Sequence, residues 1–421
     1  MNQIRTIKGT HDILPAESKK WQRLERIVHT ICRQFGYEEI RTPIFEETRL
    51  FLRSIGEDSD IVSKEMYSWS DKDGTGLTLR PELTAPVVRS FIQHNLGTQS
   101  PIQRLYYLGP SFRRERPQKG RTRQFHQFGV EAFGSSHPEQ DAEIIALAWR
   151  ILSKCGLSDG VTLHLNSIGS PECRSAYRDA LKEFIRPNLD QFSETSQRRF
   201  ESNPLRILDT KSENEQKILN DAPSITKFLN AEDRIHFDML QFFLKTLNVS
   251  FILNPKLVRG LDYYTQTVFE FTSDKLGAQD ALLGGGRYDG LVENLGGKHT
   301  PGIGFAAGME RFLIAMESLG EPHIESGNDI YFVCQDKEGI PTTLTLSNEL
   351  RQAGFNVVTD PLRRSMKAQM RDANKSNARF ALILGQTELE NESVVIKNLL
   401  DGEQDTVSQS EIIEKLRNLT N

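Results

Sequence analysis

The stretch Leu257–Phe271 begins and ends with apolar residues typical of a β-strand, yet it carries Arg259, Tyr264 and Glu270 among them. Charged and hydroxylated side chains are costly to bury unless they are paired or bind something. The glycine run Gly284–Gly286 follows nearby and permits close approach of the backbone to a ligand. Together the two segments predict a polar ligand pocket built on a sheet, with an arginine placed for an anion.

A structural explanation of the same segment is also available. The tyrosines would then belong to a core with their hydroxyls satisfied, and Arg259 would form an ion pair with Asp262. Because consecutive residues of a strand point to opposite faces, at most one of Tyr263 and Tyr264 is expected to face the pocket.

The composition is that of an ordinary globular protein, and the length favours about three domains. The 421 residues are 37% hydrophobic and 26% charged, with a net charge of −5. A polyanionic partner would therefore be met by local basic patches. Four scattered cysteines without a Cys-x-x-Cys pair argue against a zinc site and a disulfide framework. Since no signal-peptide core or membrane-spanning run is found, we expect a cytoplasmic protein with no membrane partner.

Hydrophobic periodicity organises the first part of the chain. Residues 18–35 predict an amphipathic helix, and 38–44 predict a strand whose Pro43 indicates a sheet edge or a bulge. Residues 102–134 predict a long antiparallel hairpin whose connecting loop, 116–122, is basic.

The remainder of the chain changes character twice. Helices are expected at 139–156 and 170–186, followed by a polar, helix-rich stretch over 187–250. Strand character returns at 251–271. Beyond residue 328 strands alternate with helices, which predicts a small α/β domain with a mostly parallel sheet.

The hairpin carries an arginine pair, Arg113 and Arg114, at the end of its first arm. Arginine binds phosphate bidentately, and Phe125 on the second arm offers a flat face on which a base can stack. Gln127 and Glu131 are four residues apart and lie on one face of a strand. The alternative is an ordinary polar hairpin with a solvated loop.

Two further segments permit both chemical and structural interpretations. Pro81 fixes a turn after which Glu82 and Thr84 can present oxygens to a cleft, although a capped helix start explains them more simply. Gly302–Arg311 superficially resembles a dinucleotide fingerprint, but no βαβ unit surrounds it. We interpret it as a strand packed closely on a helix whose Arg311 reaches a phosphate.

The opening segment Gly9–Pro15 is rich in turn-forming residues. Its His11 and Asp12 suggest a metal site or an acid–base pair. A local turn or helix cap is the interpretation that we favour for them.

Taken in this order, the motifs resemble those of class II aminoacyl-tRNA synthetases and, within that class, of the histidyl-tRNA synthetase family. The resemblance runs over nearly the whole chain. The similar segments are Gly9–Pro15 (N-terminal signature), residues 36–56 with Pro43 (motif 1), Phe112–Phe125 (motif 2) and Gly302–Arg311 (motif 3). Leu257–Tyr264 and Gly284–Gly290 resemble the two histidine-specific motifs, which are highly specific.

The resemblance implies an α+β fold, with the antiparallel class II sheet flanked by helices, a helical insertion and a C-terminal α/β anticodon-binding domain. The implied domains are a catalytic core in two parts (1–169 and 251–325), the insertion (170–250) and the anticodon-binding domain (329–421). A homodimer formed through motif 1 is also implied.

The same resemblance implies the reaction and its partners. The carboxylate of L-histidine attacks the α-phosphorus of ATP to form histidyl-adenylate and pyrophosphate, and the histidyl group then passes to the terminal adenosine of tRNA(His). In-line attack gains chiefly from positioning and from cations near the developing charge. Mg²⁺ would bridge phosphate oxygens, with no metal site formed by the protein alone.

For ATP, Arg113 and Arg259 would be the catalytic cations that flank the α-phosphate and the substrate carboxylate, and Arg311 would hold the γ-phosphate. Glu115 would accept from the adenine amino group and Phe125 would stack on the ring. The implied ATP-binding residues are Arg113, Glu115, Arg121, Phe125 and Arg311.

For histidine, Glu82, Thr84 and Gln127 would take the ammonium group. Glu131 and Tyr264 would hydrogen-bond the two imidazole nitrogens. Strand alternation leaves Tyr263 to pack, or to support the site, from the other face of the strand. The implied histidine-binding residues are Glu82, Thr84, Arg113, Gln127, Glu131, Arg259, Tyr263 and Tyr264.

Three consequences of the resemblance concern the rest of the chain. A site that hydrogen-bonds the substrate's polar edge rejects analogues by on the order of 10⁴–10⁵, so no editing domain is needed. The insertion is therefore interpreted as tRNA-contacting or structural, and its deletion is expected to harm charging more than activation. Leu83 departs from the family, which more often has glycine there, and a bulkier residue would shift the turn that carries Glu82 and Thr84.

A catalytically silent paralogue that senses histidine or regulates another enzyme is the main alternative. Such proteins tend to lose the anticodon domain and the charged residues of the second histidine-specific stretch, whereas this chain keeps Arg113, Arg259 and Arg311 and has about 90 residues after position 328. A general RNA-binding protein leaves the pocket unexplained. A basic set on a predicted helix is either a patch for anticodon phosphates or a solvated helix face: Arg363, Arg364, Lys367, Arg371 and Lys375.

Overall fold

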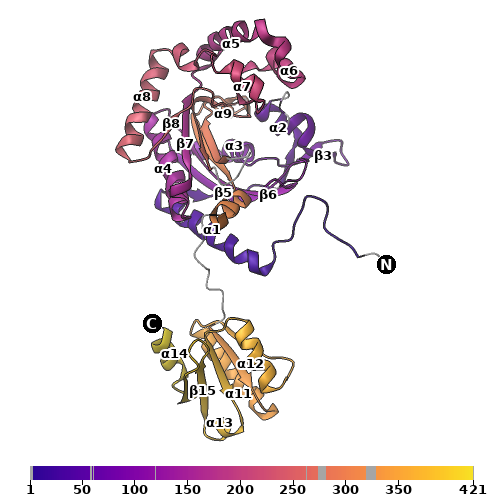
Figure 1. Ribbon diagram of the computed structural model, residues 1–421, viewed down its shortest axis with the longest axis vertical. Helices are drawn as coiled ribbons and strands as arrows, with labels where there is room; N and C mark the ends of the chain where they lie inside the picture. The colour runs from indigo at the N-terminus through magenta and orange to yellow at the C-terminus, as the bar shows by residue number, and fades with distance from the viewer. Residues whose placement is uncertain are drawn as a thin grey trace. The chain divides into compact units, whose positions relative to one another are not determined.

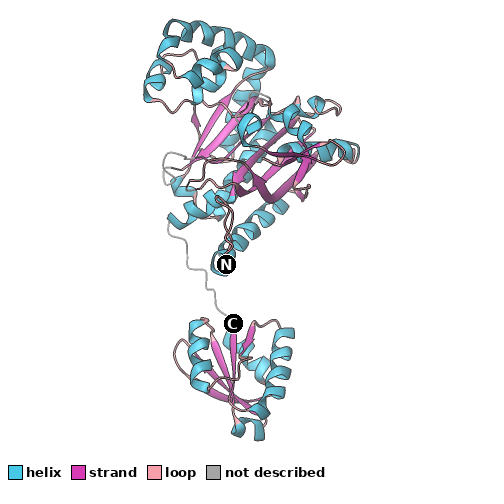
Figure 2. Ribbon diagram, turned by 90° about the vertical axis from the view of Figure 1, so that its right-hand side faces the viewer, coloured by secondary structure: helices cyan, strands magenta, loops and turns pink. Residues whose placement is uncertain are grey.

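A computed structural model describes residues 3–56, 59, 61–118, 120–261, 263–273, 281–318 and 329–420 (Figure 1). The chain forms two compact units, Met1–Pro322 and His323–Asn421. Each unit combines helices with a sheet of its own (Figure 2). No helix in the described ranges is long and apolar enough to cross a membrane.

The first unit is built on an eight-stranded sheet with the strand order β1-β5-β6-β11-β10-β9-β7-β8. Only the outermost pairs, β1 with β5 and β7 with β8, are parallel. The inner neighbours are antiparallel, which confirms the expected antiparallel sheet. The strands are β1 (Glu38–Glu39), β5 (Gln103–Phe112), β6 (Gln124–Phe133), β7 (Thr162–Ser167), β8 (Ile252–Leu253), β9 (Thr265–Thr272), β10 (Ala281–Arg287) and β11 (Gly302–Gly308).

Helices and a small second sheet surround this framework. The second sheet is antiparallel, in the order β2 (Phe45–Glu47), β4 (Gly76–Leu79) and β3 (Tyr67–Ser70). The helices are α1 (Pro15–Gln34), α2 (Thr48–Ile55), α3 (Thr84–Gln93), α4 (Pro138–Lys154), α9 (Leu291–Asn294) and α10 (Met309–Ser318), with short turns η1 (Ile61–Glu65), η2 (Leu96–Thr98) and η3 (Ser158–Gly160).

The stretch between β7 and β8 is helical, as predicted. Its elements are α5 (Pro171–Ile185), η4 (Arg186–Gln191), α6 (Glu194–Ser202), η5 (Pro204–Asp209), α7 (Glu213–Leu219), η6 (Ile225–Phe228) and α8 (Ala231–Thr246). In Figure 1, α5, α6 and α7 lie together at one end of the first unit. We refer to residues 170–250 as the helical insertion.

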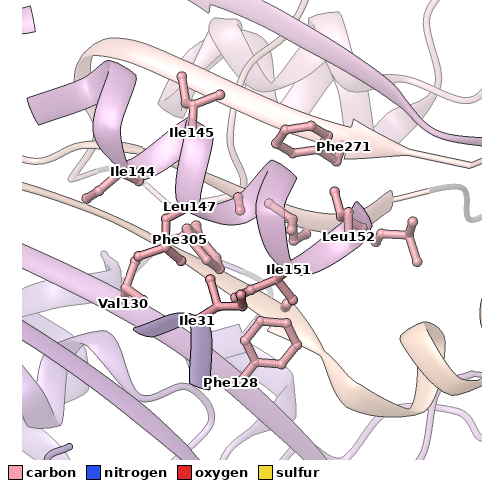
Figure 3. Packing of buried hydrophobic residues seen from close by; sticks show 14 of the residues in the cluster. Ile31, Phe128, Val130, Ile144, Ile145, Leu147, Ile151, Leu152, Phe271 and Phe305 are labelled. Atoms are coloured by element: carbon pink, nitrogen blue, oxygen red, sulfur yellow. The ribbon is translucent and has the colours of Figure 1, made fainter. Parts of the chain in front are cut away.

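One face of the large sheet is covered by α1, α4, α8 and α10, and the main core lies between them. Figure 3 shows α4 side chains such as Ile144 and Ile151 packed over Phe128 and Val130 of β6 and Phe305 of β11. Since residues alternate along a strand, the intervening residues of β6, β10 and β11 face the opposite side. That opposite side carries the candidate site.

Two local predictions need correction. The strand expected over 38–44 is only β1, because the chain leaves the ladder before Pro43, which has no backbone N–H to donate; β1 does lie at the sheet edge. The strand expected over 251–271 is interrupted between β8 and β9. There the Asn166 amide donates to the backbone carbonyls of Pro255 and Leu257 and holds an irregular segment.

The second unit has a five-stranded sheet in the order β13-β12-β14-β15-β16. Strands β12, β13 and β14 are parallel, but β15 and β16 are antiparallel, so the prediction of a mostly parallel sheet is correct only for the first three. A short helix between β14 and β15 replaces the full crossover that a parallel connection requires. The elements are β12 (Ile330–Cys334), η8 (Lys337–Gly339), α11 (Ile340–Gln352), β13 (Val357–Thr359), α12 (Met366–Lys375), β14 (Phe380–Leu384), α13 (Gln386–Glu390), β15 (Ser393–Asn398), β16 (Gln404–Ser408) and α14 (Ile412–Thr420).

Candidate active site

A cavity of about 260 Å³ lies on the open side of the large sheet. Seven elements or the segments beside them contribute to its wall, from the start of α3 to the start of α10. The predicted site residues that line it are Glu82, Thr84, Arg113, Glu115, Arg121, Phe125, Gln127, Arg259, Tyr263, Tyr264 and Arg311. The fold therefore brings together residues that are as far apart as 82 and 311 in the sequence.

Small residues form the floor of the cavity. On β11, Ile303, Phe305 and Ala307 point into the main core, so the alternate positions face the cavity side. These alternate residues of β11 and their neighbours on β10 are Gly302, Gly304, Ala306, Gly308, Gly284 and Gly286. Of these, Gly284, Ala306 and Gly308 line the cavity, whereas the side chains of Tyr264, Tyr288 and Glu131 lie against Gly286, Gly302 and Gly304.

Tyr263 and Tyr264 both line the cavity, which contradicts the expectation that only one of them faces it. Their ring centroids are 4.7 Å apart at an interplanar angle of 44°. The prediction was wrong because it assumed a strand, whereas both tyrosines precede β9 in the irregular segment. Strand alternation does not apply there.

Arg259 belongs to the same segment and forms an ion pair with Glu270 of β9. Burial disfavours the charged guanidinium, but Glu270 and then Tyr264 outweigh it, so the pKa of Arg259 is raised. Its Nε atom is buried without a hydrogen-bond partner among the residues that the structure describes. Asp262, the alternative partner considered from the sequence, lies outside the described residues.

The glycine run serves the protein's own side chains. A methyl group at Gly284 would collide with the guanidinium of Arg259, and one at Gly286 would lie 2.9 Å from the Tyr264 ring. The run thus lets Arg259 and Tyr264 lie directly against β10, which is a more specific role than backbone contact with a ligand.

We predict that Gly284→Ala lowers the activity of this site by about 10–100-fold, because it displaces Arg259 and small misplacements of reacting groups are costly. Stability should change little, since the displaced group is the end of a flexible side chain. Gly260→Ala is the matched control: it lies in the neighbouring segment and has open space around the added methyl group. Equal losses in both variants would contradict the proposed role of Gly284.

Three arginines surround the other part of the cavity. Arg113 Nε donates to the Pro81 carbonyl at 2.9 Å, and its guanidinium lies 5.2 Å from the centroid of the Phe125 ring. Arg121 pairs with Glu115 at 3.0 Å. Burial, followed by the nearby positive charge of Arg121, lowers the pKa of Arg311. Cations that are crowded and partly buried in this way indicate a site for a polyanion.

Glu82 and Thr84 combine the two roles considered from the sequence. The Glu82 carboxylate accepts from the backbone N–H groups of Thr84 at 2.5 Å and Ala85 at 2.9 Å, so it caps α3 and also lines the cavity. Burial raises the pKa of Glu82 despite these bonds. Leu83 is buried in the core with 2% exposure, and the turn still presents both neighbours to the cavity.

Glu131 is the predicted site residue that does not line the cavity in the described part of the chain. It is 1% exposed, and its carboxylate accepts from the hydroxyls of Tyr107, at 3.1 Å, and Tyr288. Burial raises the pKa of Glu131 from 4.5 to about 8, although Tyr288 and Thr84 oppose the shift. Glu131 therefore lies just behind the wall formed by Thr84.

Sequence reasoning assigned no role to several residues that shape the site. Glu270 stood out as an acid within a strand, but its pairing with Arg259 required the fold. Tyr107 and Tyr288 hold Glu131. The arginine of the second histidine-like motif, Arg287, is fully buried and pairs with Asp141 at 2.6 Å, so it supports the sheet and does not reach the cavity.

The opening segment braces the hairpin loop. The carbonyl of Gly9 accepts from the Arg123 N–H at 2.7 Å, and Gly9 lies against the side chains of Arg123 and Pro117. This supports the local-turn interpretation of Gly9–Pro15. Across the described residues, no group of three or more His, Cys, Asp or Glu side chains could hold a metal ion.

A mainly antiparallel sheet with an arginine-lined cavity on one face, in a chain that also has an anticodon-binding domain, is the arrangement expected of a class II aminoacyl-tRNA synthetase. The family model for histidyl-tRNA synthetase matches residues 9–312, and an anticodon-binding domain model matches 329–419. The chain belongs to the histidyl-tRNA synthetase family.

Individual relatives agree over full length. The chain is 49% identical to a histidine–tRNA ligase of Moorella thermoacetica, over 98% of this chain and 97% of that protein. It is 46% identical to one of a Thermoanaerobacter species, over 98% and 99%. The crystal structure of apo S. aureus histidyl-tRNA synthetase matches with a TM-score of 0.84 and 39% identity, over 99% of this chain and 100% of that one.

Proposed function

We propose that the cavity carries out histidine–tRNA ligation through the residues that line it. L-Histidine and ATP would form histidyl-adenylate and pyrophosphate there, and the histidyl group would then pass to tRNA(His). The observation that carries this proposal is the meeting of Arg113, Arg259 and Arg311 with two tyrosines and Glu82 in one cavity. It supplies cations for a triphosphate beside hydrogen-bonding groups for a small polar substrate.

The arginines of the cavity would contact different parts of the ATP triphosphate. Arg259 and Arg113 would flank the α-phosphate and the histidine carboxylate, and stabilise the negative charge that develops during in-line attack. The free Nε–H of Arg259, which lacks a described partner, supports this role. Arg311 and Arg121 would contact the remaining phosphates. Glu115 would accept from the adenine amino group.

Phe125 would stack on the adenine ring. Because Arg113 already lies over one face of this ring, the base would use the other face or displace the guanidinium.

The polar wall near α3 would bind the amino acid. Glu82, Thr84 and Gln127 would receive the ammonium group. Tyr264 and Glu131 would bind the imidazole nitrogens. Since Glu131 lies behind the cavity wall, we expect the Thr84 side chain or the irregular segment to shift when histidine binds.

Magnesium would enter with ATP. The Glu270 carboxylate lines the cavity, and Mg²⁺ commonly takes one or two carboxylates plus substrate phosphates, so the residues fit such an ion. The ion would offset phosphate charge, while Arg259 and Arg113 remain the protein's own cations at the reacting group. Activity should be lost on chelation with EDTA and return when Mg²⁺ is added.

Histidine-dependent exchange of labelled pyrophosphate into ATP tests the proposal directly. We expect exchange with L-histidine and at least about 10⁴-fold less with phenylalanine, because this analogue leaves buried polar groups unpaired. A well-folded protein without exchange would overturn the proposal and favour a histidine-sensing regulatory protein. Charging of tRNA(His) transcript would then confirm the second step.

The second unit would bind the tRNA anticodon. Lys367, Arg371 and Lys375 recur every four residues along α12 and are exposed, which supports the proposed phosphate-binding patch. Arg364 is less suited, because it pairs with Asp360 at 2.9 Å and Asp372 at 2.6 Å. Binding that does not weaken with salt when tRNA is titrated would contradict the patch.

We also propose that the protein is cytoplasmic and forms a homodimer through residues 36–56. We propose that the first unit consists of a catalytic core in two parts and the helical insertion between them. Ile44, Phe45 and Trp69 are large apolar residues with 45%, 52% and 43% exposure in or beside the small sheet, and such exposed groups favour a protein contact. Sedimentation equilibrium would decide the point: a monomer at micromolar concentration would exclude the dimer.

A further inference from the structure

The segment between β8 and β9, residues 254–264, carries Arg259, Tyr263 and Tyr264 but has no helix or strand among its described residues. Two arginines of the helical insertion hold its backbone. Arg206 of η5 donates to the Gly260 carbonyl at 2.9 Å, and Arg174 of α5 donates to the Tyr264 carbonyl at 2.6 Å. One bond therefore holds the residue that follows Arg259, and the other holds the second tyrosine of the pair.

Apolar packing joins the same two parts of the chain. Tyr177 and Leu181 of α5 belong to one continuous buried cluster with Leu257, Tyr263 and Tyr264. The core of the insertion therefore continues into the wall of the cavity. An irregular segment depends on such outside contacts for its conformation, because its described residues belong to no strand or helix.

The insertion also fixes the point at which the segment enters β9. Gln266 has φ +48°, a left-handed conformation that is unusual for a residue other than glycine. Its Nε2 donates to the Asp233 carboxylate of α8 at 2.8 Å, and its backbone N–H donates to the Gly169 carbonyl at 3.0 Å. Asp233 in turn accepts from the Ser170 N–H at 2.8 Å.

We propose that Arg174 and Arg206 are positioning residues for amino-acid activation, and that the helical insertion sets the geometry of the histidine pocket through them. This inference rests on the proposed function, which assigns the 257–264 segment to histidine binding. It differs from the expectation that the insertion serves charging more than activation. Because linkage is reciprocal, bound histidine must also stabilise the docked position of the insertion.

The test is the double variant Arg174→Ala/Arg206→Ala in pyrophosphate exchange. We expect the KM for histidine to rise about tenfold and the KM for ATP to stay within about twofold, since the two bonds hold the amino-acid side of the cavity. Arg178→Ala is the matched control, because Arg178 is exposed on the same helix one turn after Arg174. The double variant with lysine at both positions should recover part of the affinity.

Hydrogen exchange supplies a second readout that general destabilisation would not imitate. In the wild type, histidine should slow amide exchange both in 257–264 and in α5 and η5; in the double alanine variant the protection of α5 and η5 should disappear. An unchanged KM for histidine, or equal rises for histidine and ATP, would overturn the inference. Should the alanine variant not fold, the lysine variant carries the same comparison. If the wild type catalyses pyrophosphate exchange, the proposed function stands even where the KM results overturn the positioning role of Arg174 and Arg206.

Discussion

Replacing Arg259 with alanine should lower histidine-dependent pyrophosphate exchange by about 10²–10³-fold, mainly through kcat. A preorganised cation beside the developing charge is worth this much in comparable sites, since its effect is larger in the transition state than in the ground state. Arg259 is suited to the role because Glu270 and Gly284 fix its guanidinium against β10. Exchange kinetics at saturating ATP and varied histidine measure the effect.

Lysine at position 259 is the informative comparison. It keeps the charge but loses the planar fork, so we expect Arg259→Lys to recover only part of the activity. Arg178→Ala, on the surface of α5, controls for loss of a positive charge elsewhere. Equal exchange rates for the wild type and Arg259→Ala would remove Arg259 from the catalytic machinery, although the family assignment would stand.

The fold was largely predictable because its signals are local. The period of two in 124–133 and the helical spacing in 18–35 depend on neighbouring residues only, and both elements formed where expected. Pro43 likewise marked the sheet edge. The antiparallel order of β15 and β16 was missed because strand direction depends on how the chain returns, which periodicity does not report.

Most residues that line the cavity were named from the sequence, but their arrangement was not predictable. Residues such as Arg113 and Arg311 could be identified by resemblance, and the fold places both in one cavity. Pairings across the sheet, as between Arg259 and Glu270, depend on register. The predicted orientation of Tyr263 was wrong because strand-like residues at both ends of the segment concealed an irregular stretch. Arg174 and Arg206 of the insertion hold the backbone of this stretch.

Glu131→Gln should separate function from stability. Burial raises the pKa of Glu131 from 4.5 to about 8, so the folded protein binds this proton more tightly than the unfolded chain does. The contribution of Glu131 to stability is then greatest below pH 4.5 and falls as the pH rises toward 8, because ionisation of this group costs the folded state up to roughly 4–5 kcal/mol. Glutamine removes this penalty while it still accepts from the Tyr107 hydroxyl.

We therefore expect the free energy of unfolding in urea to be similar for Glu131→Gln and the wild type at pH 5, and higher for the variant at pH 8.5. Exchange activity should fall by at least about 10²-fold, because the amide is a poorer partner for the imidazole than a carboxyl group that can gain or lose a proton. Glu183→Gln, exposed on α5, controls for the charge change. A variant that is less stable than the wild type at pH 8.5 would show that the ionised carboxylate is stabilised by its two tyrosines, and a fully active variant would remove Glu131 from histidine recognition.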